Sequence, residues 1–144
     1  MIVVAILETM WNWRAQTSAA GHRDAPRYFR INPKNHSGRR LYRLVGDARL
    51  LVTNACRELV TRADQHGTPD PAWLAENLAR LDDIGRRPFD VLLVCGKVAQ
   101  ATFHACDYTP KKAHVMEIPH PAARLVWTRE FIEQTTLRIK GIEQ

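Results

Sequence analysis

The sequence predicts an α/β protein: a single three-layer αβα domain over residues 1–144, built on a mainly parallel four-stranded sheet. The first observation behind this prediction is that short apolar runs alternate along the chain with segments of helical spacing, which is typical of parallel sheets covered by helices. The second is the length of 144 residues, which fits one domain. The third is an ordinary globular composition, with 45% hydrophobic and 25% charged residues.

Four segments are expected to form the strands. Residues 2–7 (IVVAIL) are continuously apolar, as in a strand buried on both faces. We expect the other strands at residues 49–54, 89–95 and 114–118. The first run is too short to cross a membrane and has no basic leader, so we interpret it as a strand and not a signal peptide. A cytoplasmic protein with no membrane association is therefore expected.

The segments between these strands carry helix signals. Capping residues, glycine stops and apolar spacing of three and four residues mark them. Residues 8–35 show little periodicity instead, and so long a loop in a small domain is usually functional. We expect four helices. The first begins at Ser37 and ends at Gly46, and the second begins at Asp70-Pro71 and ends at Gly85. The third begins after Gly96, and Thr128 caps the fourth.

The basic residues are concentrated in one segment. The net charge is +6 and the isoelectric point is about 9.7. Arginine, whose planar fork suits phosphate, dominates the excess, and a solubilising role is the alternative. The basic cluster, with Asp24 as its only acid, comprises Arg23, Arg27, Arg30, Lys34, Arg39, Arg40 and Arg43.

The three cysteines and six histidines have no metal-ligand spacing, so we expect free thiols, no metal, no cofactor and a monomer.

Polar residues follow the expected strands where each one ends. Glu8 and Asn12 follow the first strand, Asn54 ends the second, Lys97 follows the third, and His120 follows the fourth. In open parallel sheets, ligands bind outside the carboxyl ends of the strands, so these side chains are expected at one edge. Because prolines flank His120 on both sides, it must lie on a stiff loop and not in a helix.

Four segments resemble the uracil-DNA glycosylase superfamily, in the correct order. Residues 51–56 (LVTNAC) are similar to the strand whose terminal Asn reads a flipped base, and residues 91–99 (VLLVCGKVA) resemble the strand-Gly-helix unit before the histidine loop. Residues 120–124 (HPAAR) look like that loop itself, and residues 37–41 (SGRRL) resemble the helix start after the first catalytic loop. The resemblance implies a DNA glycosylase that flips a base out of the helix and hydrolyses its N-glycosidic bond.

The resemblance also implies roles for individual residues. His120 would stabilise the departing base, Asn54 would read its edge, and either Glu8 or Asn12 would activate water. Candidates to stack on the base are Trp11, Trp13, Tyr28 and Phe29, any of which could instead be core. Candidates to contact DNA are Arg39, Arg40, Lys97, Arg124 and Leu125, with Arg124 and Leu125 filling the gap left by the flipped nucleotide.

Residues 7–12 (LETMWN) differ from the family's first loop, which carries Gly and Pro, and Ala122 replaces the usual Ser. We therefore expect a modified or damaged base as substrate, in base-excision repair or in defence against modified phage DNA. The alternative is a noncatalytic nucleotide- or nucleic-acid-binding protein that uses the same site. A serine hydrolase or a P-loop enzyme is disfavoured because the chain has neither a Gly-x-Ser-x-Gly elbow nor a P-loop.

Overall fold

The computed structural model describes residues 1–9, 25–59 and 67–143, and its centre is a four-stranded sheet in which all strands are parallel. The strand order is β2-β1-β3-β4, and β1 and β3 are buried along their whole lengths. The predicted α/β class and parallel sheet are confirmed. The strands are β1 (Ile2–Leu7), β2 (Arg49–Asn54), β3 (Val91–Cys95) and β4 (His114–Ile118).

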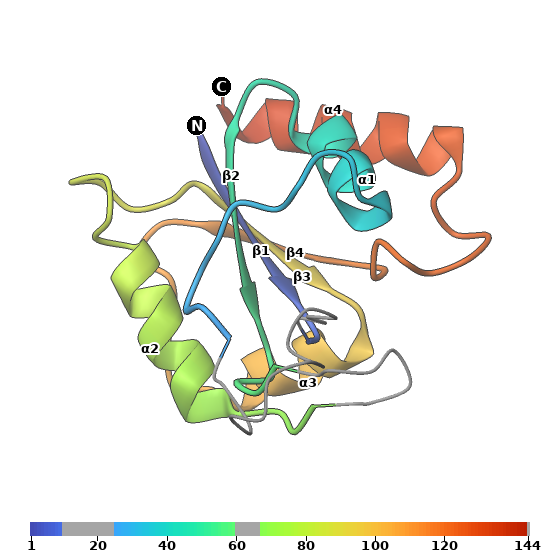
Figure 1. Cartoon of the computed structure of the whole chain (residues 1–144). Coiled ribbons are helices and arrows are strands. Elements are labelled where there is room, and N and C mark those ends of the chain that lie inside the picture. The colour runs from blue at the N-terminus through green and yellow to red at the C-terminus, as the bar shows by residue number, and fades with distance from the viewer. Residues whose placement is uncertain (10–24, 60–66, 144) are drawn as a thin grey trace.

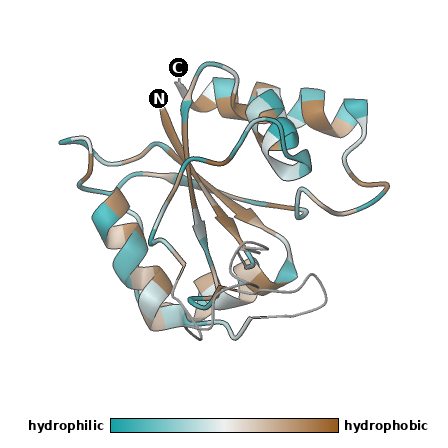
Figure 2. Ribbon diagram, viewed as in Figure 1, coloured by the Kyte–Doolittle hydropathy of each residue, from teal (hydrophilic) through white to brown (hydrophobic). Residues whose placement is uncertain are grey.

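Helices cover both faces of this sheet (Figure 1). Alternate residues of β1 divide between the two faces. Val3 and Ala5 pack with α1 and α4, whereas Val4 and Ile6 pack with α2 and α3. Figure 2 shows the strands as the hydrophobic centre and most hydrophilic residues on the helices and loops around them. The helices are α1 (His36–Val45), α2 (Pro71–Leu81), α3 (Lys97–Ala105) and α4 (Arg129–Glu143).

Three element ends differ from the sequence prediction. Helix α1 begins before Ser37, because the side chain of Asn35 accepts a hydrogen bond from the Gly38 amide and caps the helix there. Strand β3 begins at Val91 and not at residue 89, since the pairing register with β1 starts with Val3 opposite Val91.

Helix α2 ends at Leu81, before the predicted stop at Gly85. The next residue, Asp82, is buried, and its carboxylate accepts hydrogen bonds from the Tyr108 hydroxyl and the Lys111 amide. A tertiary contact therefore ends this helix. The predicted caps Asp70 and Thr128 do bind amides in the first turns of α2 and α4.

The strand order places a topological switch point between β1 and β3. The chain leaves β1 for α1 on one face, whereas it leaves β3 for α3 on the other face. Ligands of open parallel sheets bind where the connections diverge in this way, outside the carboxyl ends of the strands. This topology directs attention to the ends of β1 and β3 and to the residues beside them.

Candidate strand-end site

Asn54 is the most unusual residue at the strand ends. It lies opposite Leu7 at the end of β2, and its side chain is 1% exposed. Neither its amide nitrogen nor its amide oxygen has a hydrogen-bond partner among the residues that the structure describes. An orphaned buried polar group costs about 1–3 kcal/mol, and most buried polar groups have partners. Such a side chain offers one donor and one acceptor together to a planar ligand.

His120 is held in one orientation by its own loop. Its Nδ1 accepts a hydrogen bond of 3.0 Å from the Ala122 amide, and its carbonyl accepts one of 2.8 Å from the Trp127 indole N–H. Burial lowers the pKa of His120 below its ordinary value, and the negative charge of Glu8 opposes this shift to a smaller extent. The imidazole is therefore neutral at pH 7. Because Nδ1 is an acceptor, the ring proton belongs on Nε2.

Gly96 allows the histidine loop to approach the end of β3. Its φ is +89°, and a Cβ placed on it would lie 3.0 Å from the Cβ of His120. The Gly96 amide also donates to the carbonyl of Ile118 at 2.9 Å. Glycine tolerates both the positive φ and the close contact, which a larger residue would not. The loop that follows β4 thus lies against the end of the neighbouring strand β3.

Three polar groups consequently line neighbouring strand ends: Asn54 on β2, Glu8 after β1 and His120 over β3. The carbonyl of Glu8 accepts a bond of 3.0 Å from Cys56, which extends the pairing of β1 with β2. Asn54 and His120 are separated by two inter-strand spacings, or about 10 Å. A single planar base with hydrogen bonds at two edges fits that interval.

Arg40 has a role that the sequence did not indicate. We expected it to contact DNA, but its guanidinium donates to the carbonyls of Pro121 and Ala123 and lies 5.9 Å from the centroid of the Trp127 ring. It therefore fixes the conformation of the histidine loop. The contact joins residues 81 positions apart, so no local pattern reveals it.

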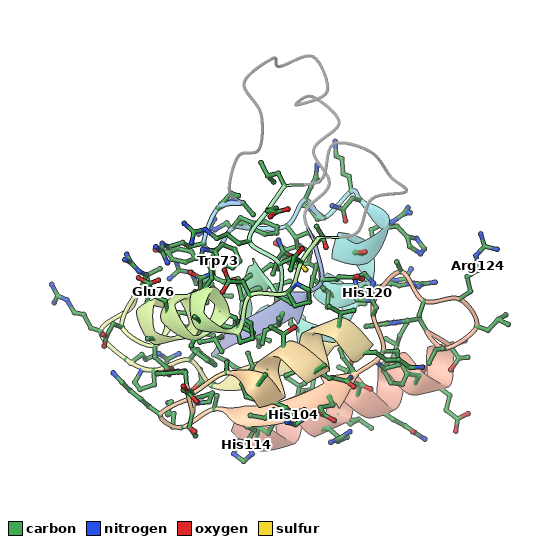
Figure 3. All side chains as sticks on the ribbon, turned by 90° about the horizontal axis from the view of Figure 1, so that it is seen from below. Trp73, Glu76, His104, His114, His120 and Arg124 are labelled. Atoms are coloured by element: carbon green, nitrogen blue, oxygen red, sulfur yellow. The ribbon has the colours of Figure 1, made fainter. Side chains whose placement is uncertain are left out.

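The other predicted DNA contacts are exposed. Arg39 lies on α1, Lys97 is the first residue of α3, and Arg124 projects from the loop after His120 (Figure 3). Leu125 is 96% exposed and has a φ of +66°. An apolar side chain in this conformation is unusual, and strained backbone of this kind clusters at functional sites.

The described aromatic candidates pack on opposite sides of the sheet. Phe29 pairs with Val52 along the edge of β2 and packs with the α1–α4 layer, whereas Tyr28 packs with the α2–α3 layer. The structure thus gives both rings a packing role and does not bring them together. The candidates Trp11, Asn12 and Trp13 lie outside the described residues.

The cysteines near the site are poor nucleophiles. Burial raises the pKa of the Cys56 thiol at the end of β2, and burial also raises that of Cys95 in β3. Both thiols are neutral at pH 7, and the thiolate is the reactive form. Cys106 is a free thiol that is only partly buried. Cysteine-based covalent catalysis through Cys56 or Cys95 is therefore disfavoured.

Comparison with models of protein families, with curated proteins and with solved structures gave no match for this chain. Within residues 1–9, 25–59 and 67–143, no group of three His, Cys, Asp or Glu side chains is placed to hold a metal ion. No helix in that part of the chain has the length and apolar character needed to span a membrane.

Proposed function

We propose that the protein is a DNA glycosylase, which flips out a modified or damaged base and hydrolyses the N-glycosidic bond that holds it. The observation that carries the proposal is the buried, unpartnered amide of Asn54, two strands from the neutral imidazole of His120. A flipped base presents a donor and acceptor edge that suits such an amide. The order of strand-end residues that resembles uracil-DNA glycosylases supports the same function.

His120 suits the departing base. When the glycosidic bond breaks, its electron pair stays with the base, which becomes an anion. The Nε2–H of a neutral imidazole donates a hydrogen bond to that anion without losing its own proton, and solvent then protonates the base. Preorganised donors of this kind contribute about 100-fold or more to rate. The hydrogen bonds from Ala122 and Trp127 hold His120 in place for this task.

Glu8 suits the sugar side of the reaction. The sugar becomes cation-like as the bond breaks, and a carboxylate stabilises that charge. A water molecule then adds its oxygen to the anomeric carbon, and its proton passes to the carboxylate and on to solvent. The end of β1, where Glu8 lies, is between the Asn54 and His120 positions. Asn12 remains the second candidate for orienting the water.

Single-turnover release of bases from duplex oligonucleotides tests this proposal. The substrates carry uracil, hypoxanthine or an enlarged pyrimidine, and we expect the modified bases to be released faster than uracil. His120→Ala should lower the rate about 100-fold or more. His114→Ala is the matched control, since His114 is exposed at the opposite end of β4, and it should leave the rate unchanged.

Three outcomes would contradict the proposal or a part of it. Binding of DNA without release of any base would favour the alternative, a noncatalytic protein that holds a nucleotide at the same site. Equal or faster release of uracil would leave a glycosylase but refute the preference for modified bases. Equal rates for His120→Ala and the native chain would remove His120 from the reaction.

A further inference from the structure

A cationic pocket lies beside the loop that carries His120. A pocket of about 270 Å³ opens between the face of α1 and the start of α4. Its basic residues fall at positions 36, 39, 40 and 43, a spacing of three and four residues that places them on one helix face. None of the described residues that line it is acidic. We call it the α1 pocket, and its lining residues are His36, Arg39, Arg40, Arg43, Trp127 and Ile132.

The positive charge of the α1 pocket is not compensated within the described residues. The side chains of Arg39 and Arg43 are exposed and form no hydrogen bond or ion pair there, and the sequence of α1 contains no acid. Like charges three and four residues apart destabilise a helix. An anion bound between these side chains would remove that cost.

One wall of the α1 pocket is already fixed. Arg40 is bound to the carbonyls of Pro121 and Ala123, and Trp127 is bound to the carbonyl of His120. The ring of Phe131 packs edge-on against Trp127, with the centroids 5.1 Å apart. A preformed wall lowers the entropy that binding must overcome. Arg40 therefore belongs both to the α1 pocket and to the loop that holds His120.

We infer that the α1 pocket binds a phosphate group, with Arg39 and Arg43 as its ligands and Arg40 linking it to the His120 loop. Paired guanidinium groups match the oxygens of phosphate through bidentate hydrogen bonds. The phosphate is a backbone phosphodiester of the DNA strand whose base enters the strand-end site. In naming DNA, this inference rests on the proposed function, whereas the phosphate chemistry rests on the pocket alone.

The double variant Arg39→Gln/Arg43→Gln tests the assignment. Binding of a fluorescent duplex oligonucleotide is measured over a range of salt concentrations. We expect affinity to fall about 10- to 100-fold, as for lost hydrogen bonds between charged groups. The plot of log affinity against log salt should become shallower by about 0.9, the value for one phosphate contact. Arg80→Gln/Arg138→Gln is the control, because it removes the same charge from exposed sites on α2 and α4.

The link through Arg40 has its own measurement. Inorganic phosphate is titrated into the protein while the ring resonances of His120 and His114 are followed by NMR. We expect phosphate to shift the His120 resonance and not that of His114. Arg40→Lys should keep the protein folded but abolish the shift, because an ammonium group lacks the planar fork that bridges two carbonyls. An unchanged shift in this variant would refute the coupling.

The outcomes separate this inference from the proposed function. Base release together with unchanged affinity and salt slope in Arg39→Gln/Arg43→Gln would overturn the phosphate site and leave the glycosylase. Arginine-dependent DNA binding without release of any base would overturn the glycosylase and leave the phosphate site. If a nucleoside monophosphate binds as tightly as the oligonucleotide and loses affinity in the same variant, the phosphate site stands and free nucleotide is its ligand.

Discussion

At the scale of single residues, the role proposed for Asn54 works against the stability of the fold. Its two polar atoms are buried and have no partner within the described part of the chain, so the fold carries an unsatisfied amide there. Buried polar groups without partners are rare in native proteins, and a catalytic role is one of the explanations for those that occur. The neighbouring Thr53 shows the contrast, because its hydroxyl is equally buried but donates to the carbonyl of Arg27 at 2.7 Å.

The first prediction is that Asn54→Leu gives a more stable but inactive protein. Leucine has a similar shape and no polar atoms, so the variant removes the orphaned amide. We expect a gain of about 1–3 kcal/mol in the free energy of unfolding, measured in urea. Base release should be lost. A less stable variant would mean that the amide has a partner in the folded chain.

The second prediction concerns the pKa of His120. Burial lowers it and the Glu8 carboxylate raises it, so Glu8→Gln should lower it further. The Nδ1 atom accepts a hydrogen bond from the Ala122 amide, so it cannot carry a proton unless that hydrogen bond breaks. Activity should therefore be full at neutral pH and fall as the pH drops through the lowered pKa.

Stability should follow the same direction. A histidine with a depressed pKa in the folded state contributes stability above its unfolded value of about 6.5, and this stability is lost as the pH falls through the folded pKa. NMR titration of the His120 imidazole resonances in the native chain and in Glu8→Gln measures the shift directly. A pKa of His120 that rises in Glu8→Gln would contradict the proximity of the two groups.

At the scale of elements, the close approach between β3 and the histidine loop depends on Gly96. The third prediction is that Gly96→Ala destabilises the fold by about 1–3 kcal/mol, because the residue has positive φ. It should also reduce base release, since the new Cβ meets that of His120. Gly46→Ala is the matched control. Gly46 has a φ of +57° but nothing within 4 Å of the added Cβ, so this variant should lose stability and keep activity.

The loop after β4 presents Leu125 to solvent on a rigid base. Arg40 holds the carbonyls of Pro121 and Ala123, and the Thr128 amide donates to Val126 at 2.9 Å. Apolar side chains of this kind enter base steps and hold DNA in a kinked form.

The fourth prediction is that Leu125→Ala slows release from duplex DNA by about tenfold, as expected for a loss of about 1.4 kcal/mol. Release from single strands should be unaffected, because they leave no gap in a stack to be filled. The free energy of unfolding should change by less than about 0.5 kcal/mol, as for most surface substitutions. Equal slowing on both substrates would mean that Leu125 does not act as a wedge.

The sequence predicts best those elements that local pattern alone defines. The bounds of β1, β2 and β4 agree with the expected residues 2–7, 49–54 and 114–118. For β1 the pattern is clearest, since all six of its residues are apolar. The predicted end of α2 was wrong, because the Asp82 carboxylate accepts hydrogen bonds from Tyr108 and Lys111 in a distant loop. The same distinction holds at the site. Strand order alone predicts that Asn54 and His120 lie at one edge, but only the fold reveals the contacts made by Gly96 and Arg40.

At the scale of the whole molecule, some of the basic side chains have no acidic partner among the described residues. Several arginines form ion pairs with acids on α2, on α4 and directly before β3. The arginines of α1 and of the histidine loop have no such acid among the described residues. The matched pairs are Arg27 and Arg80 with Glu76, Arg87 with Asp90, and Arg129 with Glu133.

The last prediction follows from this distribution of charge. The unmatched arginines lie beside the strand-end site, so the net charge of +6 is expected to act as a DNA-binding surface and not only as a source of solubility. If about five phosphates are neutralised, log affinity for duplex DNA should fall with a slope of about −4 to −5 against log salt. Fluorescence anisotropy between 50 and 200 mM salt, or about that range, measures the slope. A slope near zero would mean that the arginines do not contact the backbone, and the electrostatic argument would then fail even if a base is released.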